Sequence, residues 1–77
     1  MDLELTGILV PADWDDMGVI HSFALMTDDE GEHLLDIEKR CSELKEHVNK
    51  RVRVAGALKV NKEKHLIKVK KFSVLNY

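Results

Sequence analysis

The sequence predicts an all-β domain with one short helix. Hydrophobic and polar residues alternate with period two in several segments, which is typical of half-buried strands. Glycine, proline or Asp-rich turn signals separate these segments. Only one segment, around Leu44, instead places apolar side chains one helical turn apart.

Length and composition indicate one globular domain over residues 1–77, because 77 residues leave room for a single core. The composition, 44% hydrophobic and 34% charged, is neither disordered nor membrane-embedded. Cys41 is the only cysteine, so no internal disulfide can form, and we expect a cytoplasmic protein. The chain start lacks a signal-peptide pattern and no apolar run is long enough to span a membrane, so we expect no membrane association.

Charge is divided along the chain. The first 38 residues contain 11 Asp or Glu and no Lys or Arg, and all 12 basic residues lie from Lys39 to Lys71. A closed sheet would set the acidic half against the basic half, so we expect the two to neutralise each other. We further expect the first and last strands to be neighbours and to mix the two signs.

Residues 3–10 form the first expected strand. Its apolar alternation shifts phase after Gly7, which predicts a bulge there, and Pro11 is expected to end or bend the strand. A polar connection follows and closes at Gly18. Residues 19–27 then alternate again as a second strand.

Asp28 to Gly31 is a hairpin signal, and residues 32–38 are the expected partner strand. Ser42 is then positioned to cap a short helix, because its hydroxyl can accept hydrogen bonds from the amides of the first turn. Asn49 is the expected left-handed stop for that helix.

Residues 51–60 form the clearest strand, with an almost unbroken alternation. The turn at residues 61–64 leads to a last strand over residues 65–75. The apolar residues of this strand change phase across Lys70 and Lys71, which predicts a bulge.

The order of three strands, a short helix and two strands resembles the OB-fold, a five-stranded Greek-key β-barrel. The most specific similarity is the stretch from Leu44 to Gly56, in which a helix stop leads into a valine-alternating fourth strand. Many OB domains have glycine at the place of Asn49, and Gly7 in a long bent first strand is a second similarity. The resemblance implies a binding face among residues 19–38, flanked by the loops at 12–18 and 61–64.

We expect a non-catalytic binding module whose partner is a protein. The second and third strands and their flanks carry six carboxylates and no basic residue, so this face should repel phosphate. The expected contacts lie on the first long loop or on the outward register of those strands, and they are Trp14, Met17, Ser22, Ala24, Met26, Leu34 and Asp36.

The alternative is weak binding of single-stranded nucleic acid through the basic C-terminal hairpin, with Trp14 as a stacking surface. Its expected contacts are Trp14, Arg51, Arg53, Lys59, Lys62, Lys64, Lys68, Lys70 and Lys71. We favour a different interpretation, in which these lysines solvate the hairpin and pair with acidic neighbours, and Trp14 covers a barrel end.

No pattern indicates an enzyme, a metal site or a cofactor. The segment from Asp13 to Gly18 begins like a calcium loop, but Met17 and Ala24 stand where oxygen ligands are needed. The four histidines show no metal-ligand spacing with one another or with Cys41. We also find no glycine-rich phosphate loop and no activated serine.

Overall fold

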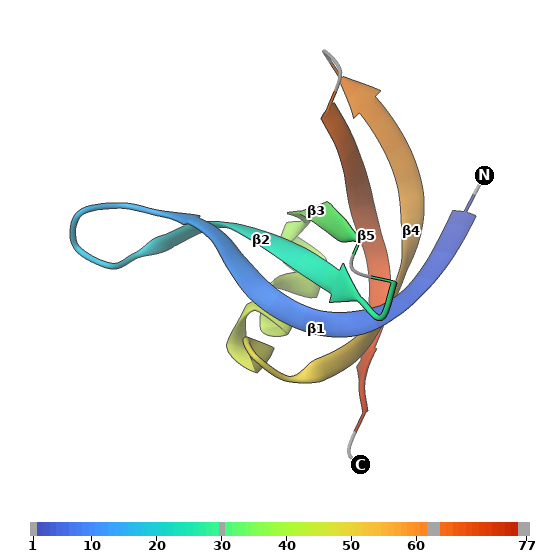
Figure 1. Cartoon of the computed structure of the whole chain (residues 1–77), viewed down its shortest axis with the longest axis horizontal. Coiled ribbons are helices and arrows are strands. Elements are labelled where there is room, and N and C mark those ends of the chain that lie inside the picture. The colour runs from blue at the N-terminus through green and yellow to red at the C-terminus, as the bar shows by residue number, and fades with distance from the viewer. Residues whose placement is uncertain (1, 30, 62–63, 76–77) are drawn as a thin grey trace.

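The computed structural model describes residues 2–29, 31–61 and 64–75, which form a closed five-stranded β-barrel (Figure 1). The elements are β1 (Asp2–Trp14), β2 (Ile20–Thr27), β3 (Glu32–Ile37), the 3-10 helix η1 (Lys39–His47), β4 (Arg51–Asn61) and β5 (Lys64–Val74). The predicted all-β class, with one short helix between the third and fourth strands, is confirmed. β2 to β5 begin and end within one residue of the predicted bounds, whereas β1 is longer.

The strand order around the barrel is β1-β2-β3-β5-β4, and β4 pairs with β1 to close it. The expectation that the first and last strands are neighbours is therefore wrong. The two halves of the chain instead meet at two seams, where β1 runs antiparallel to β4 and β3 runs parallel to β5. Each seam places a strand of the acidic half beside a strand of the basic half.

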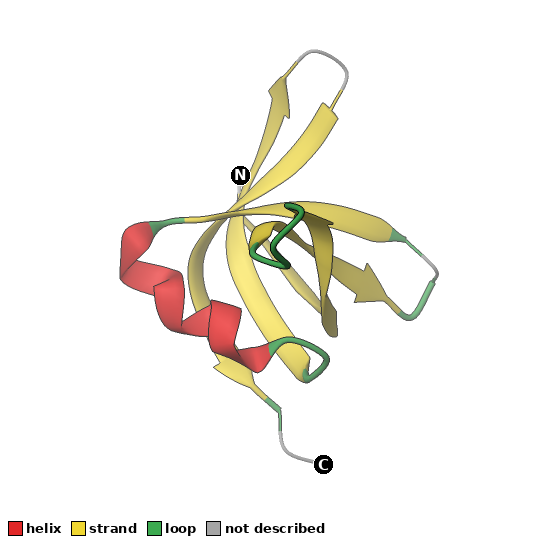
Figure 2. Ribbon diagram, turned by 90° about the vertical axis from the view of Figure 1, so that its left-hand side faces the viewer, coloured by secondary structure: helices red, strands yellow, loops and turns green. Residues whose placement is uncertain are grey.

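The barrel interior is packed with side chains from every strand and from η1. The buried cluster contains Leu9, Phe23, Leu25, Leu35, Cys41, Leu44, Val52, Val54, Ile67 and Val69. Cys41 and Leu44 come from η1, which packs against β3 and β5 and lies beside the strands in Figure 2. The helix therefore completes the core where the strands alone would leave it open.

Gly7 is not a bulge. Leu3, Leu5 and Leu9 all pack in or against the core, so β1 keeps one alternation throughout, and its registers with Thr27 and Val52 run through Gly7 without a shift. Glycine is required there for a different reason: a Cβ on Gly7 would overlap the carbonyl oxygen of Met26 on β2. The backbones of β1 and β2 can approach this closely only without a side chain.

Pro11 does not end β1, which continues to Trp14. The amide of Leu9 donates to the carbonyl oxygen of Lys50 at 3.1 Å, away from β2. The nitrogen of Pro11, two residues further on, faces the same side, and the pairing of β1 with β4 has already ended at Ile8. Proline therefore removes no hydrogen bond between strands. Register shifts between Pro11 and Trp14 then bend the strand.

The bulge predicted in the last strand is confirmed. Ala55 pairs with Lys71 and Gly56 pairs with Val69, which leaves Lys70 as the extra residue of β5. Gly56 lies against the carbonyl oxygen of Lys68 so closely that a Cβ would overlap it. The bulge and the missing side chain together let β5 turn sharply across β4.

The first of the two predicted turns lies where expected. At the first, the amide of Thr27 donates to the carbonyl oxygen of Gly31 at 3.0 Å, and the carboxylate of Asp29 accepts hydrogen bonds from the Thr27 hydroxyl and the Gly31 amide. These bonds hold the pKa of Asp29 below its usual value. At the second, β4 and β5 pair as far as Asn61 and Lys64, and residues 62–63 lie outside the described residues.

The helix begins earlier than predicted. Lys39 is its first residue, Glu38 is extended, and Ser42 lies inside the helix and does not cap it. Cys41 departs from helical geometry, where its buried side chain directs Sγ to the carbonyl oxygen of Lys70 at 3.4 Å. Cys41 thus joins the first turn of η1 to the bulge of β5. The predicted left-handed stop is confirmed, because Asn49 has φ of 70°.

Replacing Gly7 with Ala should reduce the free energy of unfolding by about 3 kcal/mol, since the new methyl group must displace the backbone of β2. Gly18→Ala is the matched control: Gly18 has φ of 85° but open space around it, so only the left-handed backbone is penalised, by about 1 kcal/mol. Urea unfolding of both variants measures the difference. Equal stability of Gly7→Ala and wild type would contradict the close approach of β1 and β2.

Candidate interaction surface

Two hairpins extend beyond the barrel, and Figure 1 shows one directed to the left and the other to the top. We call residues 12–22 the acidic hairpin, because they contain three Asp and no Lys or Arg. Residues 58–66 are the basic hairpin, which contains three Lys and one Glu. Every large hydrophobic side chain that is exposed in the described part of the chain lies on them: Trp14, Met17, Val19, Leu58 and Val60.

Asp15 organises the loop of the acidic hairpin. Its Oδ1 accepts hydrogen bonds from the amides of Met17 at 2.9 Å and Val19 at 3.0 Å, and its Oδ2 lies 3.1 Å from Nε2 of His21. The amide of Gly18 donates to the carbonyl oxygen of Asp15 at 3.0 Å. The hydrogen bond from Val19, followed by those from Met17 and His21, holds the pKa of Asp15 below its usual value. Trp14 and Met17 are thus exposed on a loop with a defined conformation.

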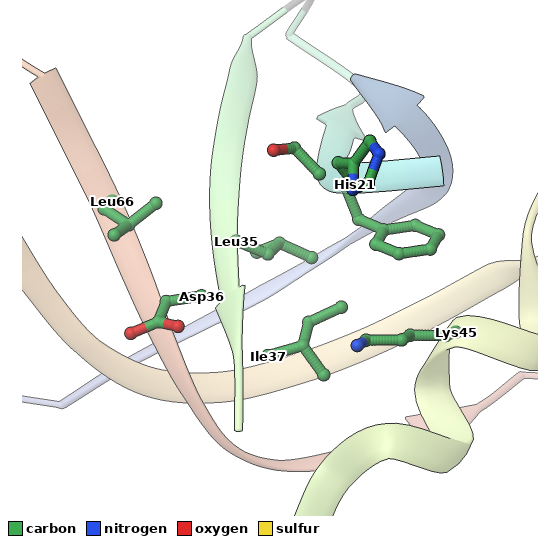
Figure 3. A pocket seen from close by; sticks show the side chains of 8 residues that line it. His21, Leu35, Asp36, Ile37, Lys45 and Leu66 are labelled. Atoms are coloured by element: carbon green, nitrogen blue, oxygen red, sulfur yellow. The ribbon is translucent and has the colours of Figure 1, made fainter. Parts of the chain in front are cut away.

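A hollow of about 260 Å³ opens between β2 and β3 (Figure 3). It exists because the pairing of these strands ends at Phe23 and Leu35, although β2 begins at Ile20 and β3 continues to Ile37. Figure 3 shows the side chain of Lys45 extending from η1 toward Ile37 across this opening. The full lining is His21, Ser22, Phe23, Leu35, Asp36, Ile37, Lys45 and Leu66. The hollow thus combines an apolar floor with charged groups.

The structure brings together part of the predicted partner-binding set. Trp14 and Met17 are 58% and 89% exposed on the acidic hairpin, and Ser22 and Asp36 line the adjoining hollow. Met26 and Leu34 are half-buried on the outer surface of the barrel.

Ala24 is a wrong prediction, because it is fully buried. It follows the outward alternation of β2, but its register partners on the flanking strands are the larger residues Val10 and Leu34. A methyl group between two such neighbours is covered by them, so Ala24 cannot contact a partner.

Sequence reasoning missed Val19, Lys45, Leu58 and Val60. Val19, Leu58 and Val60 follow the inward alternation of their strands, yet all three are exposed because the hairpins have left the barrel at those positions. No signal in the alternation marks that departure. Lys45 could be placed at the hollow only once the position of η1 was known.

Among the described residues, four ion pairs join the two halves of the chain, each between a carboxylate from the first 38 residues and a later cation. They are Arg51–Asp28 at 3.1 Å, Arg53–Glu4 at 3.8 Å, Lys59–Asp36 at 3.6 Å and Lys68–Glu38 at 2.9 Å. The predicted pairing of the acidic half with the basic half is therefore present at these four contacts. Because these pairs are solvent-exposed, each contributes only about 0–1 kcal/mol to stability.

The predicted nucleic-acid set is divided: Trp14 lies on the acidic hairpin, whereas Arg53 and Lys71 line one hollow on the barrel wall. Arg51, Arg53, Lys59 and Lys68 are paired with carboxylates, and Lys70 and Lys71 are exposed at the bulge of β5. Lys62 and the side chain of Lys64 lie outside the described residues. Trp14 is on the acidic hairpin, apart from the basic one (Figure 1), and does not cover a barrel end.

No three His, Cys, Asp or Glu side chains among residues 2–29, 31–61 and 64–75 are grouped so that they could hold a metal ion. In the same ranges, no helix has the length and apolar character needed to cross a membrane.

No protein-family model, curated protein or solved structure matches this chain. The interpretation of the hairpins and the hollow therefore depends on their geometry and chemistry.

Asp15→Ala should disorder the loop of the acidic hairpin, because the amides of Met17 and Val19 lose their acceptor. In the wild type, the pKa of Asp15 is lowered, so the ionised carboxylate stabilises the loop fully at pH values above the ordinary aspartate pKa of about 3.9. This contribution is lost as the pH falls through the lowered pKa. NMR titration should show the Met17 and Val19 amides shifting with the midpoint of the Asp15 carboxyl. Asp16→Ala should leave the titration midpoint of both amides unchanged. A midpoint at or above the ordinary aspartate pKa would contradict the assignment to Asp15.

A double-mutant cycle on Glu38 and Lys68 should give the largest coupling of the four pairs, since these are the least exposed side chains among them, at 29% and 35%. We expect about 0.5–1 kcal/mol for Glu38→Gln with Lys68→Met. The matched cycle on Glu4 and Arg53, which are more exposed, should give less. Urea unfolding at low and high salt measures both coupling energies. A larger coupling for Glu4 and Arg53 than for Glu38 and Lys68 would show that burial does not govern the strength of these pairs.

Proposed function

We propose that this protein is a non-catalytic OB-fold module that binds a protein partner through the acidic hairpin and the adjoining hollow between β2 and β3. The closed five-stranded barrel, with its helix between the third and fourth strands, supports the OB-fold resemblance. In that fold, the face of strands two and three and the loops joining strands one to two and four to five bind the ligand. The acidic and basic hairpins occupy those two loop positions.

The observation that carries the proposal is the exposure of Trp14 and Met17, at 58% and 89%, on a loop held by its own hydrogen bonds. Monomeric proteins seldom gather large apolar side chains on their surface without a binding role, and Trp and Met are enriched at protein interfaces. The hydrogen bonds of Asp15 set the loop conformation before binding, which lowers the entropy cost of association.

A protein partner fits this surface better than a nucleic acid does. The acidic hairpin carries three carboxylates and no cation, so it repels phosphate. Four of the cations that would bind phosphate already contact carboxylates, and Trp14 lies on the other hairpin.

The combined variant Trp14→Ser and Met17→Ser should lose the partner. We expect a protein captured by the wild type from its native extract to bind this variant at least about tenfold more weakly, because interface aromatics are binding hot spots. Arg53→Ser with Lys71→Ser, on the barrel wall, is the matched control and should retain the partner. Circular dichroism confirms that both variants fold.

The nucleic-acid alternative is tested by NMR titration with short DNA and RNA oligomers at low salt. We expect no amide shifts at an oligomer concentration of about 1 mM. Shifts confined to residues 51–71 that fade as salt rises would replace the proposed function with single-strand binding.

A further inference from the structure

We propose that the partner bound by the acidic hairpin is a second copy of this chain, which contributes its basic hairpin. This inference rests on the proposed function, because it names the partner of the same surface. Two observations lead to it: the hairpins carry opposite charges, and together they hold all the exposed large hydrophobic side chains of the described residues.

The two hairpins are complementary in charge and in apolar character. The acidic hairpin exposes Trp14, Met17 and Val19 among Asp13, Asp15 and Asp16. The basic hairpin exposes Leu58 and Val60, at 45% and 66%, and its sequence supplies three Lys. The apolar side chains of the two hairpins can pack together while the surrounding carboxylates of one face the lysines of the other. Two hairpins of the same charge repel each other, so this pairing excludes contacts between like hairpins.

This complementarity cannot be satisfied within one molecule. Figures 1 and 2 show the two hairpins projecting from the barrel in different directions, so their described strands do not contact each other. Asp13 and Asp16 form no ion pair with any described residue. Lys59 contacts Asp36 at 3.6 Å, but both side chains are exposed, so exchanging this partner for another carboxylate costs little.

Each hairpin also has a strand edge that is unpaired in the described residues. β1 pairs with β4 from Asp2–Ala57 to Ile8–Arg51, so Leu58–Asn61 of β4 has β5 on one side only. Beyond Leu9, whose backbone contacts Asn49 and Lys50, β1 likewise has only β2 beside it. An exposed strand edge with large apolar side chains is a site for pairing with another chain.

The contact joins unlike surfaces, so each copy offers one acidic and one basic hairpin to its neighbours. Such an interface closes into a ring or continues as a chain of copies. Its signature is an apparent mass that rises with concentration, together with a change in the environment of both hairpins.

Trp14 is the only tryptophan in the chain, so its fluorescence reports directly on the acidic hairpin. As the protein is concentrated from about 1 μM to about 1 mM at low salt, we expect its emission to shift to shorter wavelength while light scattering shows a rising mass. Leu58→Ser with Val60→Ser should weaken association at least about tenfold and abolish the shift. A protein that stays monomeric at about 1 mM, with unchanged emission, overturns the inference.

Charge reversal tests which surfaces meet. Asp13→Lys with Asp16→Lys makes both hairpins basic, and Lys59→Glu with Lys64→Glu makes both acidic, so each variant alone should remain monomeric. An equimolar mixture should associate, because each hairpin then finds one of opposite sign on the other variant. Lys71→Glu on the barrel wall is the control and should associate as the wild type does. If the first variant associates like the wild type, or the mixture stays monomeric, the inference is wrong.

The outcome also separates this inference from the proposed function. A monomeric protein that still captures a different partner, and loses it with Trp14→Ser and Met17→Ser, overturns the second copy and leaves the binding module standing. A monomeric protein whose capture is unaffected by those substitutions overturns both. If the wild type associates and the substitutions on either hairpin abolish that association, both the proposed function and this inference are supported.

Discussion

The pairing of β1 with β4 closes the barrel, and the rest of the structure depends on this closure. The seven-residue register from Asp2–Ala57 to Ile8–Arg51 brings together segments about fifty residues apart in the chain. It is sterically allowed because β1 crosses β2 at Gly7 and β4 crosses β5 at Gly56, where a Cβ on either glycine would overlap a carbonyl oxygen of the neighbouring strand. Without those crossings, Leu9, Val52 and Val54 would not share one interior.

Closure also determines where the charges lie. The acidic first half and the basic second half meet at the β1–β4 and β3–β5 seams. The pair Arg53–Glu4 spans the first seam, and Lys68–Glu38 lies at the end of the second. Each pair is weak because it is exposed, so the pairs do not hold the barrel together. Their effect is to place a carboxylate beside each of Arg51, Arg53, Lys59 and Lys68.

The two hairpins exist because β1–β2 and β4–β5 continue after the barrel has closed. Within the barrel an alternating strand buries one face, but beyond it the same alternation leaves Val19, Leu58 and Val60 in solvent. Part of the proposed binding surface is therefore built from residues whose alternation is that of a core. The divergence of β2 and β3 after Phe23 adds the hollow beside the acidic hairpin.

The sequence by itself determined the all-β class, the order of the elements, the bulge at Lys70 and the left-handed backbone of Asn49. Each of these follows from local features: the alternation of apolar residues, the turn residues, and the tolerance of asparagine for positive φ. It also determined that acidic strands would meet basic ones. Only the tertiary structure decided which strands pair, why Gly7 is glycine and where Pro11 is tolerated, since each depends on the backbone of a distant strand. Exposure was likewise decided there: Ala24 is covered by Val10 and Leu34, while Trp14 is left in solvent, because burial depends on neighbours that alternation does not specify.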